Sequence, residues 1–122
     1  MPLLAVTCQT DHIAAWKDCY RGVQQMGAKD RTFVLSESGH IAGIVNPPSK
    51  KKYSHYTNSD LTGAPDAWLE GAVRHDGSWW PLWEAWLRKR SGKKVAARIP
   101  GDSDYKLLEP APGSYVRIKA SI

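Results

Sequence analysis

The sequence has 122 residues and a formal net charge of +5, and 42% of its residues are hydrophobic and 24% charged. This length fits one domain with a modest core, and the composition is ordinary for a globular protein, which argues against a disordered chain. No apolar run approaches the roughly 20 residues that cross a bilayer, and the N-terminus lacks a signal-peptide pattern. We therefore expect a cytoplasmic protein with no membrane partner.

The charged residues limit the class of partner that we expect, and the cysteines indicate the redox compartment. The positive charge indicates an anionic partner without naming its class. The basic run Lys50–Lys52 is typical of a solvated loop, and no helix-turn-helix, zinc or RNP pattern accompanies it, so we predict no nucleic-acid partner. Cys8 and Cys19 are too few for a disulfide framework and lack metal-ligand spacing. We expect two buried free thiols in a reduced compartment.

The first part of the chain, residues 1–48, predicts a strand, a helix and a second strand. Residues 3–7 form a short, largely apolar run, as in a strand buried on both faces. Apolar residues then recur every three or four positions over residues 13–26, before Gly27, where a helix would stop. Residues 32–35 are again β-branched and aromatic. This order suits a parallel βαβ unit, which places the ends of both strands at one edge of a sheet.

The second part predicts a loop and two helices. Residues 49–64 are polar and rich in turn formers, which indicates a surface loop. Within residues 65–92, Pro65 begins a helix that ends near Gly77, and Ser78 caps a second helix. Residues 93–122 are predicted to form an extended tail.

Apolar side chains give each of these later segments an expected packing face. The first helix presents Trp68, Leu69, Ala72 and Val73. The second presents Trp79, Leu82, Trp83, Trp86 and Leu87. The tail is expected to be held to a surface by Tyr105, Leu107, Leu108 and Tyr115. For the tryptophan cluster we favour core packing, with binding of a polymer or a protein partner as the alternative.

Asp11 and His40 are the candidate catalytic residues. Each follows the carboxyl end of a predicted parallel strand, the sheet edge where α/β proteins bind ligands. A carboxylate beside an imidazole fixes its tautomer and stabilises its charged form, so that the ring can act as a general base. The chain order, with the acid before the histidine, is that of α/β-hydrolases. Ile41, Ile44 and Val45 are expected to keep this edge dry.

A structural interpretation of the same residues is also open. An aspartate after a strand often caps the following helix, and a histidine after a glycine is often a surface residue. No nucleophile elbow of the G-x-S-x-G kind is present, and neither Cys8 nor Cys19 is flanked by the glycines that such a turn needs. Spacing alone therefore leaves the pair without a nucleophile.

Four motifs carry a resemblance to a known family. The stretches DHIAAW, FVLSESGHIAGIVNPP, WLEGAVRHDGSWWPLWEAWL and LEPAPGSYVRIKA closely resemble the carboxyl-terminal end of class I polyhydroxyalkanoate synthases, which polymerise (R)-3-hydroxyacyl-CoA into storage polyester. The resemblance covers essentially the whole chain. It implies the carboxyl-terminal part of an α/β-hydrolase fold and a Cys-Asp-His triad, of which Asp11 and His40 match the acid and the histidine. Ala15 departs from the proline usual in the first motif.

The resemblance also implies a mechanism and partners. His40 would deprotonate the catalytic thiol and then the hydroxyl of the incoming unit, with Asp11 orienting the ring. No cofactor is implied, because the CoA thioester is the substrate. The family's cysteine box is absent, so the chain resembles the last fifth of such an enzyme and is expected to be inactive alone. Its implied partners are the acyl-CoA, the polyester chain, the amino-terminal synthase portion and a second copy in a dimer.

The other three histidines are not expected to take part in catalysis, and a noncatalytic function for the chain also remains open. His12 is expected to be structural, although it could support Asp11, and His55 and His75 are expected to be solvated in a loop and on a helix. The alternative to an acyltransferase segment is a noncatalytic module that uses its tryptophans to associate with polyester granules or with a full-length synthase. The granule surface would then be its location.

Overall fold

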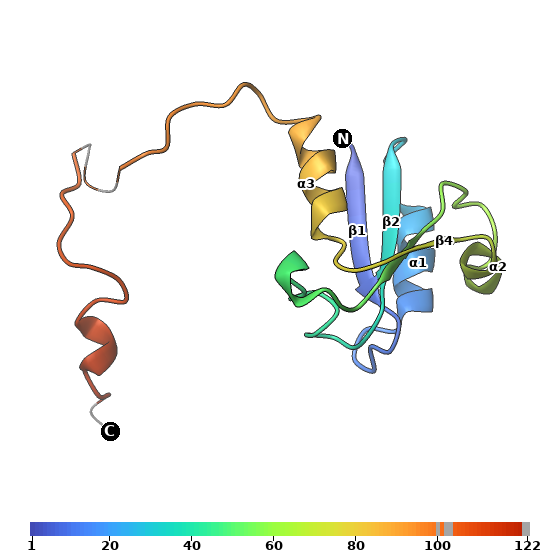
Figure 1. Ribbon diagram of the computed structural model, residues 1–122, viewed down its shortest axis with the longest axis horizontal. Coiled ribbons are helices and arrows are strands. Elements are labelled where there is room, and N and C mark those ends of the chain that lie inside the picture. Colours follow the sequence, from blue (N-terminus) through green and yellow to red (C-terminus); the bar gives the residue numbers. More distant parts are fainter. Residues whose placement is uncertain (100, 102–103, 121–122) are drawn as a thin grey trace. The chain divides into compact units, whose positions relative to one another are not determined.

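A computed structural model describes residues 1–99, 101 and 104–120, and the chain divides into two units, Met1–Ser91 and Gly92–Ile122 (Figure 1). In chain order the first unit contains β1 (Leu3–Cys8), α1 (Trp16–Gln25), β2 (Arg31–Ser36), the 3₁₀ turn η1 (Pro48–Lys50), β3 (His55–Thr57), α2 (Pro65–Glu70), β4 (Val73–His75) and α3 (Trp80–Arg88). The second unit contains the 3₁₀ turn η2 (Tyr115–Arg117).

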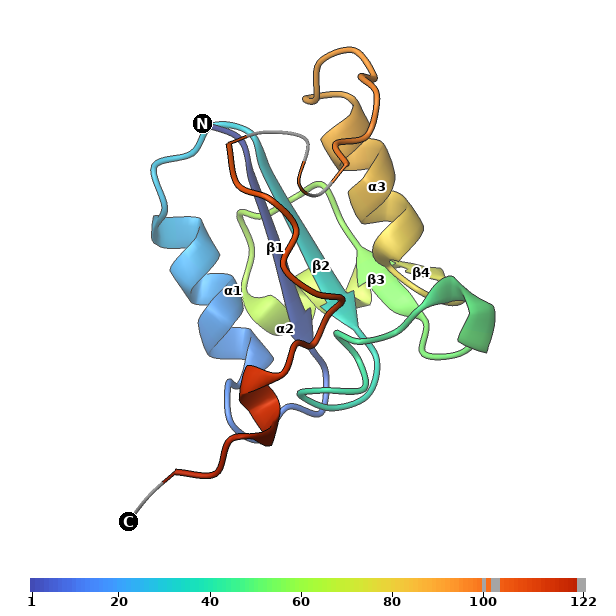
Figure 2. The same ribbon diagram turned by 90° about the vertical axis from the view of Figure 1, so that its left-hand side faces the viewer.

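One sheet of four strands, in the order β1-β2-β3-β4, organises the first unit. β1 and β2 are parallel, from Leu3 opposite Arg31 to Cys8 opposite Ser36, and α1 connects them, which confirms the predicted βαβ unit. β3 runs antiparallel to both β2 and β4. Helices α1 and α3 lie on opposite sides of the strands (Figure 2). The chain is therefore α/β, with a mixed rather than a purely parallel sheet.

Two short strands stand where other structure was predicted. β3 falls inside the predicted loop, and β4 lies where the helix beginning at Pro65 was expected to continue towards Gly77. That helix ends at Glu70, and Val73 is exposed instead of sharing the buried face of Trp68. The backbone of β3 pairs with the free edge of β2, and β4 pairs with β3 in turn. Tertiary pairing has therefore overridden a local sequence that carries no strand pattern.

Helix α1 and strand β1 also differ in detail from the prediction. The buried side chains of α1 are Trp16, Tyr20 and Val23, as the periodicity predicts. Ile13 is exposed and precedes the helix, so the apolar face begins one turn later than expected. β1 is half-buried over most of its length because it is the edge strand of this sheet, and the expectation of burial on both faces is not met within the chain.

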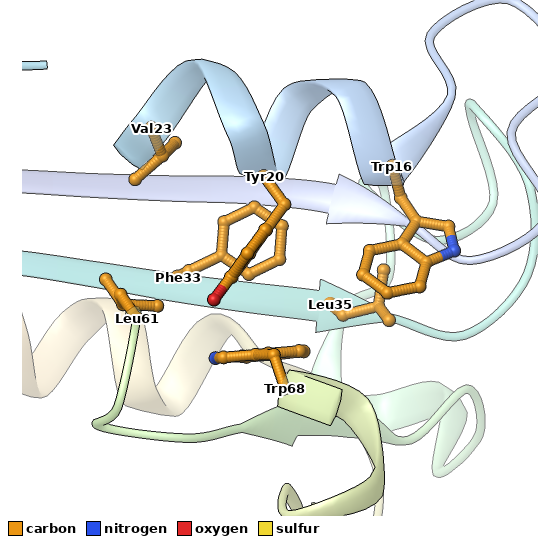
Figure 3. Packing of buried hydrophobic residues seen from close by; sticks show 7 residues of the cluster. All are labelled: Trp16, Tyr20, Val23, Phe33, Leu35, Leu61 and Trp68. Carbon is orange, nitrogen blue, oxygen red and sulfur yellow. The ribbon is translucent and has the colours of Figure 1, made fainter. Parts of the chain in front are cut away.

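An aromatic core fills the space between α1 and the sheet (Figure 3). It consists of Trp16, Tyr20, Val23, Phe33, Leu35, Leu61 and Trp68. The Trp68 ring lies 5.1 Å from that of Phe33, edge to face, and 5.6 Å from that of Tyr20. The Tyr20 hydroxyl donates a hydrogen bond to the Gly63 carbonyl at 3.2 Å, which satisfies its polar end. This core fixes β1, α1 and β2 and thereby the ends of the two parallel strands.

The other side of the sheet is less completely covered. Trp79 is buried, but the side chains of Trp83 and Leu87 on α3 are 41% and 38% exposed. α3 contributes no buried residue of its own within the described part of the chain. The predicted apolar stripe therefore exists, but much of it lacks a packing partner in these residues.

The second unit has little regular structure in the residues that are described. Glu109 accepts hydrogen bonds from the backbone N–H of Ser114 at 2.8 Å and from its hydroxyl at 2.9 Å, just before η2. The expected docking of the tail through its apolar side chains stays a prediction, and residues 100, 102–103 and 121–122 of that tail lie outside the described residues. No helix in the described part of the chain has the length and apolar character needed to cross a membrane.

Candidate active site

The loops after β1 and β2 remain paired beyond the ends of the strands. The N–H of Gln9 donates to the Ser36 carbonyl at 2.8 Å, and the N–H of Thr10 donates to the Ser38 carbonyl at 3.1 Å. Ser38 has a φ of 72°, a left-handed conformation that turns the second loop sharply at this point. The parallel pairing therefore brings the segment after Thr10 beside the segment after Ser38.

This pairing places Asp11 against His40. Nδ1 of His40 lies 2.7 Å from Oδ2 of Asp11, within the distance of a charge-assisted hydrogen bond. The Asp11 side chain is 7% exposed, whereas about half of the His40 side chain is exposed. The two residues singled out from the sequence are thus in direct contact, with a sheltered acid and an accessible imidazole.

The second oxygen of Asp11 holds the backbone before α1. Oδ1 accepts hydrogen bonds from the N–H groups of Ile13 at 2.8 Å and Ala14 at 2.9 Å. The bond from Ala14, followed by that from His40, holds the pKa of the Asp11 carboxyl at about 2, well below its ordinary value. Capping and contact with the imidazole are therefore compatible roles, one for each oxygen. The turn around Oδ1 also explains why α1 begins at Trp16 instead of Ile13.

The ionised acid fixes the state of the imidazole. A carboxylate only accepts hydrogen bonds, so Nδ1 of His40 must carry the proton that lies between them. Nε2 then holds the free lone pair, and no group among the described residues hydrogen-bonds to it. The arrangement can therefore accept a proton at Nε2 and stabilise the resulting imidazolium through Asp11.

The dry edge expected around the histidine is not present in this chain. Ile41 is 72% exposed and Val45 is also exposed, while Ile44 is half-buried. Their side chains belong to a loop on the surface of the first unit, and nothing in the described residues covers Ile41 or Val45. Shielding of the pair by these residues would need further protein surface against the loop.

Neither thiol of the chain is placed as a nucleophile. Cys8 is fully buried, and burial together with the negative charge of Asp11 raises the pKa of its thiol to about 11, so the thiol stays protonated. Cys19 is half-buried on α1. The expected free, buried character is confirmed for Cys8. No group of three or more His, Cys, Asp and Glu side chains in the described part of the chain is arranged to hold a metal ion.

The other histidines are only partly as predicted. His12 is exposed, and no hydrogen bond in the described part of the chain joins it to Asp11 or His40. His55 was expected to be solvated but is 5% exposed, because β3 carries it into the sheet, where its Nδ1 contacts the Gly77 carbonyl at 2.9 Å. Its ring stacks on His75 with centroids 5.0 Å apart. His75 is exposed, on β4 and not on a helix.

The residues that hold the loop of His40 were missed in the sequence. Ser36, Gly43, Trp79 and Trp80 connect this loop to the end of β2 and to the start of α3 through hydrogen bonds. Apolar periodicity groups Trp79 with the α3 stripe and carries no information about the indole N–H groups of Trp79 and Trp80. A pair of adjacent tryptophans at the start of a predicted helix was the available signal.

Comparison with known proteins gives close relatives over nearly the whole chain. It is 47% identical over 121 residues to a poly(3-hydroxyalkanoate) polymerase subunit of Cupriavidus necator, covering 98% of this chain and 20% of the relative. It is 45% identical over 116 residues to the corresponding subunit of Rhizobium etli, covering 95% and 18%. A poly(3-hydroxyalkanoate) polymerase of Methylorubrum extorquens is 42% identical over 121 residues, covering 98% and 20%. No family model matches the chain.

These relationships confirm the resemblance carried by the four motifs. The chain is a relative of poly(3-hydroxyalkanoate) polymerases, and it spans about a fifth of the length of the curated relatives it matches.

Proposed function

We propose that this chain supplies the general base and its orienting carboxylate to a polyhydroxyalkanoate synthase, an acyltransferase that moves (R)-3-hydroxyacyl groups from CoA to a growing polyester. The observation that carries this proposal is the 2.7 Å contact between His40 and Asp11 at the carboxyl ends of two parallel strands. Its second support is the relationship to polymerases over nearly the whole chain.

The chemistry requires a thiol, which we propose lies in polymerase sequence beyond these 122 residues. Nε2 of His40 takes the proton of that thiol, and the thiolate bonds to the carbonyl carbon of the acyl-CoA. The bond from that carbon to the CoA sulfur breaks, and CoA leaves with the proton held by the imidazolium. Nε2 then takes the proton of a hydroxyl group, whose oxygen attacks the enzyme thioester. An ester forms, and the thiol regains its proton.

Asp11 has two roles in this scheme. It accepts the Nδ1 proton of His40, which keeps the lone pair on Nε2, and its charge stabilises the imidazolium between the two proton transfers. Its other oxygen anchors the turn before α1, so the carboxylate is held in place from both sides. The low pKa of Asp11 keeps it ionised throughout the neutral range.

We further propose that residues 1–48 are the last βαβ unit of an α/β-hydrolase sheet. The free edge of β1 supports this assignment, because β1 pairs with β2 alone among the described strands and all of its residues except Cys8 are only half-buried. A parallel strand added at that edge would carry its own carboxyl end towards Asp11 and His40. The nucleophile of such folds lies at the carboxyl end of a strand.

The test uses a chimera in which this chain replaces the matching fifth of the Cupriavidus necator polymerase. Release of CoA from (R)-3-hydroxybutyryl-CoA is measured for the chimera and for His40→Gln, Asp11→Asn and His12→Gln. We expect His40→Gln and Asp11→Asn to lower kcat by about 10²- to 10⁴-fold, the usual contribution of a general base. His12→Gln is the matched control and should stay close to the parent. Retained turnover in His40→Gln would rule out the proposed role.

The 122-residue chain alone should release no CoA from the same substrate, since Cys8 is buried and protonated and Cys19 lies on a helix. Turnover that disappears in Cys8→Ala or Cys19→Ala would show that the thiol lies in this chain. This measurement separates the origin of the nucleophile from the role of the histidine.

A second candidate function rests on the exposed face of α3. Trp83 and Leu87 leave apolar surface open to solvent, which favours a noncatalytic module that binds polyester granules or a full-length synthase. Sedimentation of the chain with purified polyester granules tests this alternative. Binding that persists in His40→Gln and is lost in a Trp83→Gln, Leu87→Gln double variant would support it.

A further inference from the structure

The loop that carries His40 is held by groups that do not touch the imidazole. We define this loop as residues 39–46. At its first turn, the N–H of Gly43 donates to the Gly39 carbonyl at 3.0 Å, so the position of Gly43 sets that of the residues around His40. A contact that fixes the position of Gly43 therefore also restrains His40, because a single backbone turn includes both residues.

The carbonyl of Gly43 is fixed from two directions. The hydroxyl of Ser36, the last residue of β2, donates to it at 2.9 Å, and the indole N–H of Trp79 donates to it at 3.0 Å. Both of these bonds are buried. The next carbonyl, that of Ile44, accepts the indole N–H of Trp80 at 2.9 Å. Two adjacent tryptophans at the start of α3 thus bind two adjacent carbonyls of the loop.

The glycine at the centre of this arrangement is required by its surroundings. A Cβ atom on Gly43 would lie 2.5 Å from Sγ of Cys8 and 2.6 Å from the carbonyl oxygen of Glu37. The loop backbone therefore sits directly on the end of β1 and on the start of the loop after β2. The loop backbone has no room to move towards the sheet. The hydrogen bonds from the two indole N–H groups restrain it on the side of α3.

We propose that Trp79 and Trp80 are positioning residues for His40, and that their indole N–H groups hold the loop so that Nδ1 of the imidazole stays within reach of Asp11. The positional part of this inference concerns the chain itself. Its consequence for turnover rests on the proposed function. The alternative is that both tryptophans serve only to pack α3 on the sheet. A phenylalanine keeps most of the ring and removes the N–H, so Trp79→Phe and Trp80→Phe distinguish the two.

The chain provides a matched control on the same helix. Trp86 also carries a buried indole N–H, but this N–H has no hydrogen-bond partner in the described part of the chain. Trp86→Phe is the same chemical change without loss of a bond to the loop. Its effect measures what the exchange of a ring alone costs.

The first readout is the Hδ1 resonance of His40 in chain labelled with ¹⁵N-histidine. This proton lies in the hydrogen bond to Asp11, which shifts its resonance downfield. The resonance is seen only while that bond protects the proton from exchange with water. We expect the signal in the parent and in Trp86→Phe, and its loss or broadening in Trp79→Phe and in the Trp79→Phe, Trp80→Phe double variant. Where the chain alone does not stay in solution, the same signal is recorded on the chimera.

The second readout is turnover of (R)-3-hydroxybutyryl-CoA by the chimera. A base displaced by about 1 Å loses up to a hundredfold in rate, so we expect Trp79→Phe to lower kcat by about tenfold to a hundredfold with KM within about twofold. Unchanged Hδ1 signals and unchanged kcat in the double variant would overturn the inference, as would an equal loss in Trp86→Phe. If His40→Gln remains active, the proposed function fails, and the Hδ1 signal still decides whether the tryptophans hold the ring.

Discussion

Tryptophans cover both sides of the sheet, but they do so in different ways. On the α1 side, Trp16 and Trp68 are buried in a cluster of tilted and edge-to-face rings. On the α3 side, Trp83 is 41% exposed, and only Trp79 among the tryptophans of that region is buried. The first set excludes water from an apolar core, and the indole N–H of Trp68 donates to the Asn58 carbonyl at 3.3 Å beside that core. Trp79 and Trp80 instead donate to two carbonyls of the loop that carries His40.

The two sides of the sheet therefore have different roles: one determines the stability of the first unit, and the other determines the position of the imidazole. The α1 core is complete within the first unit, so its residues should determine whether this unit folds. The α3 side buries less surface and instead connects to the loop of His40, so its residues should determine where the imidazole lies. The four predictions below test this division, in order of decreasing effect.

The largest effect should come from the α1 side. Trp68 is 2% exposed and contacts the rings of Trp16, Tyr20 and Phe33, so Trp68→Ala should lower the free energy of unfolding by about 3–5 kcal/mol. That loss approaches the whole stability of a small domain. Trp83→Ala, at a half-exposed position, should cost only about 1 kcal/mol. Urea unfolding of the chain, followed by circular dichroism, measures both, and equal costs would contradict the division.

The second effect should come from crowding beneath the loop. Gly43→Ala places a methyl group against Cys8 and the Glu37 carbonyl and should cost about 1–3 kcal/mol. The additional Cys8→Ala change should recover only part of this loss, because the backbone contact remains. Gly22 in α1 has no atom within 4 Å of a built Cβ, so Gly22→Ala is the control and should stabilise the chain by about 0.5–1 kcal/mol.

The predictable part of the fold is the part in which local pattern and tertiary structure agree. The apolar positions of α1, together with a crossover of suitable length, predicted the parallel pair β1 and β2, and this pair brings Asp11 to His40. The contact followed from topology, because residues after adjacent parallel strands share one edge. Its fine geometry did not, since it depends on the pairing of Thr10 with Ser38 beyond the strands.

The unpredicted parts depend on partners that are distant in sequence. His55–Thr57 is short and polar, and it becomes β3 only because β2 offers a free edge. The burial of His55 follows from that pairing. The α3 stripe was predicted correctly as a pattern, but a pattern says neither whether a partner surface lies in these residues nor where an indole N–H points. The hydrogen bonds of Trp79 and Trp80 therefore had no sequence signal beyond the adjacency of the two tryptophans.

The third prediction uses pH to separate the contribution of Asp11 to stability from that of the buried His55. The Asp11 pKa is about 2 in the folded chain and about 3.9 when unfolded, so its contribution is present above pH about 4 and is lost as the pH falls towards 2. Burial lowers the pKa of His55, so the unfolded state binds a proton first and stability falls below pH about 6.5.

The urea midpoint is measured against pH for the parent, Asp11→Asn and His55→Gln. Asp11→Asn should flatten the curve below pH about 4, and His55→Gln should flatten the fall that begins at pH about 6.5. An unchanged slope below pH about 4 in Asp11→Asn would contradict the stabilising role assigned to its carboxylate.

The smallest effect should come from Trp86, and its sign is informative. Its buried indole N–H has no partner in the described residues, so Trp86→Phe removes an unsatisfied donor, which should be worth up to about 1 kcal/mol. The guanidinium of Arg90 lies 4.0 Å from the centre of the ring, and a phenylalanine weakens that attraction by about 0.5 kcal/mol. The net change in the free energy of unfolding should therefore lie within about 0.5 kcal/mol of zero. A loss above about 1 kcal/mol would show that this ring belongs to a packed core, and the α3 side would then resemble the α1 side.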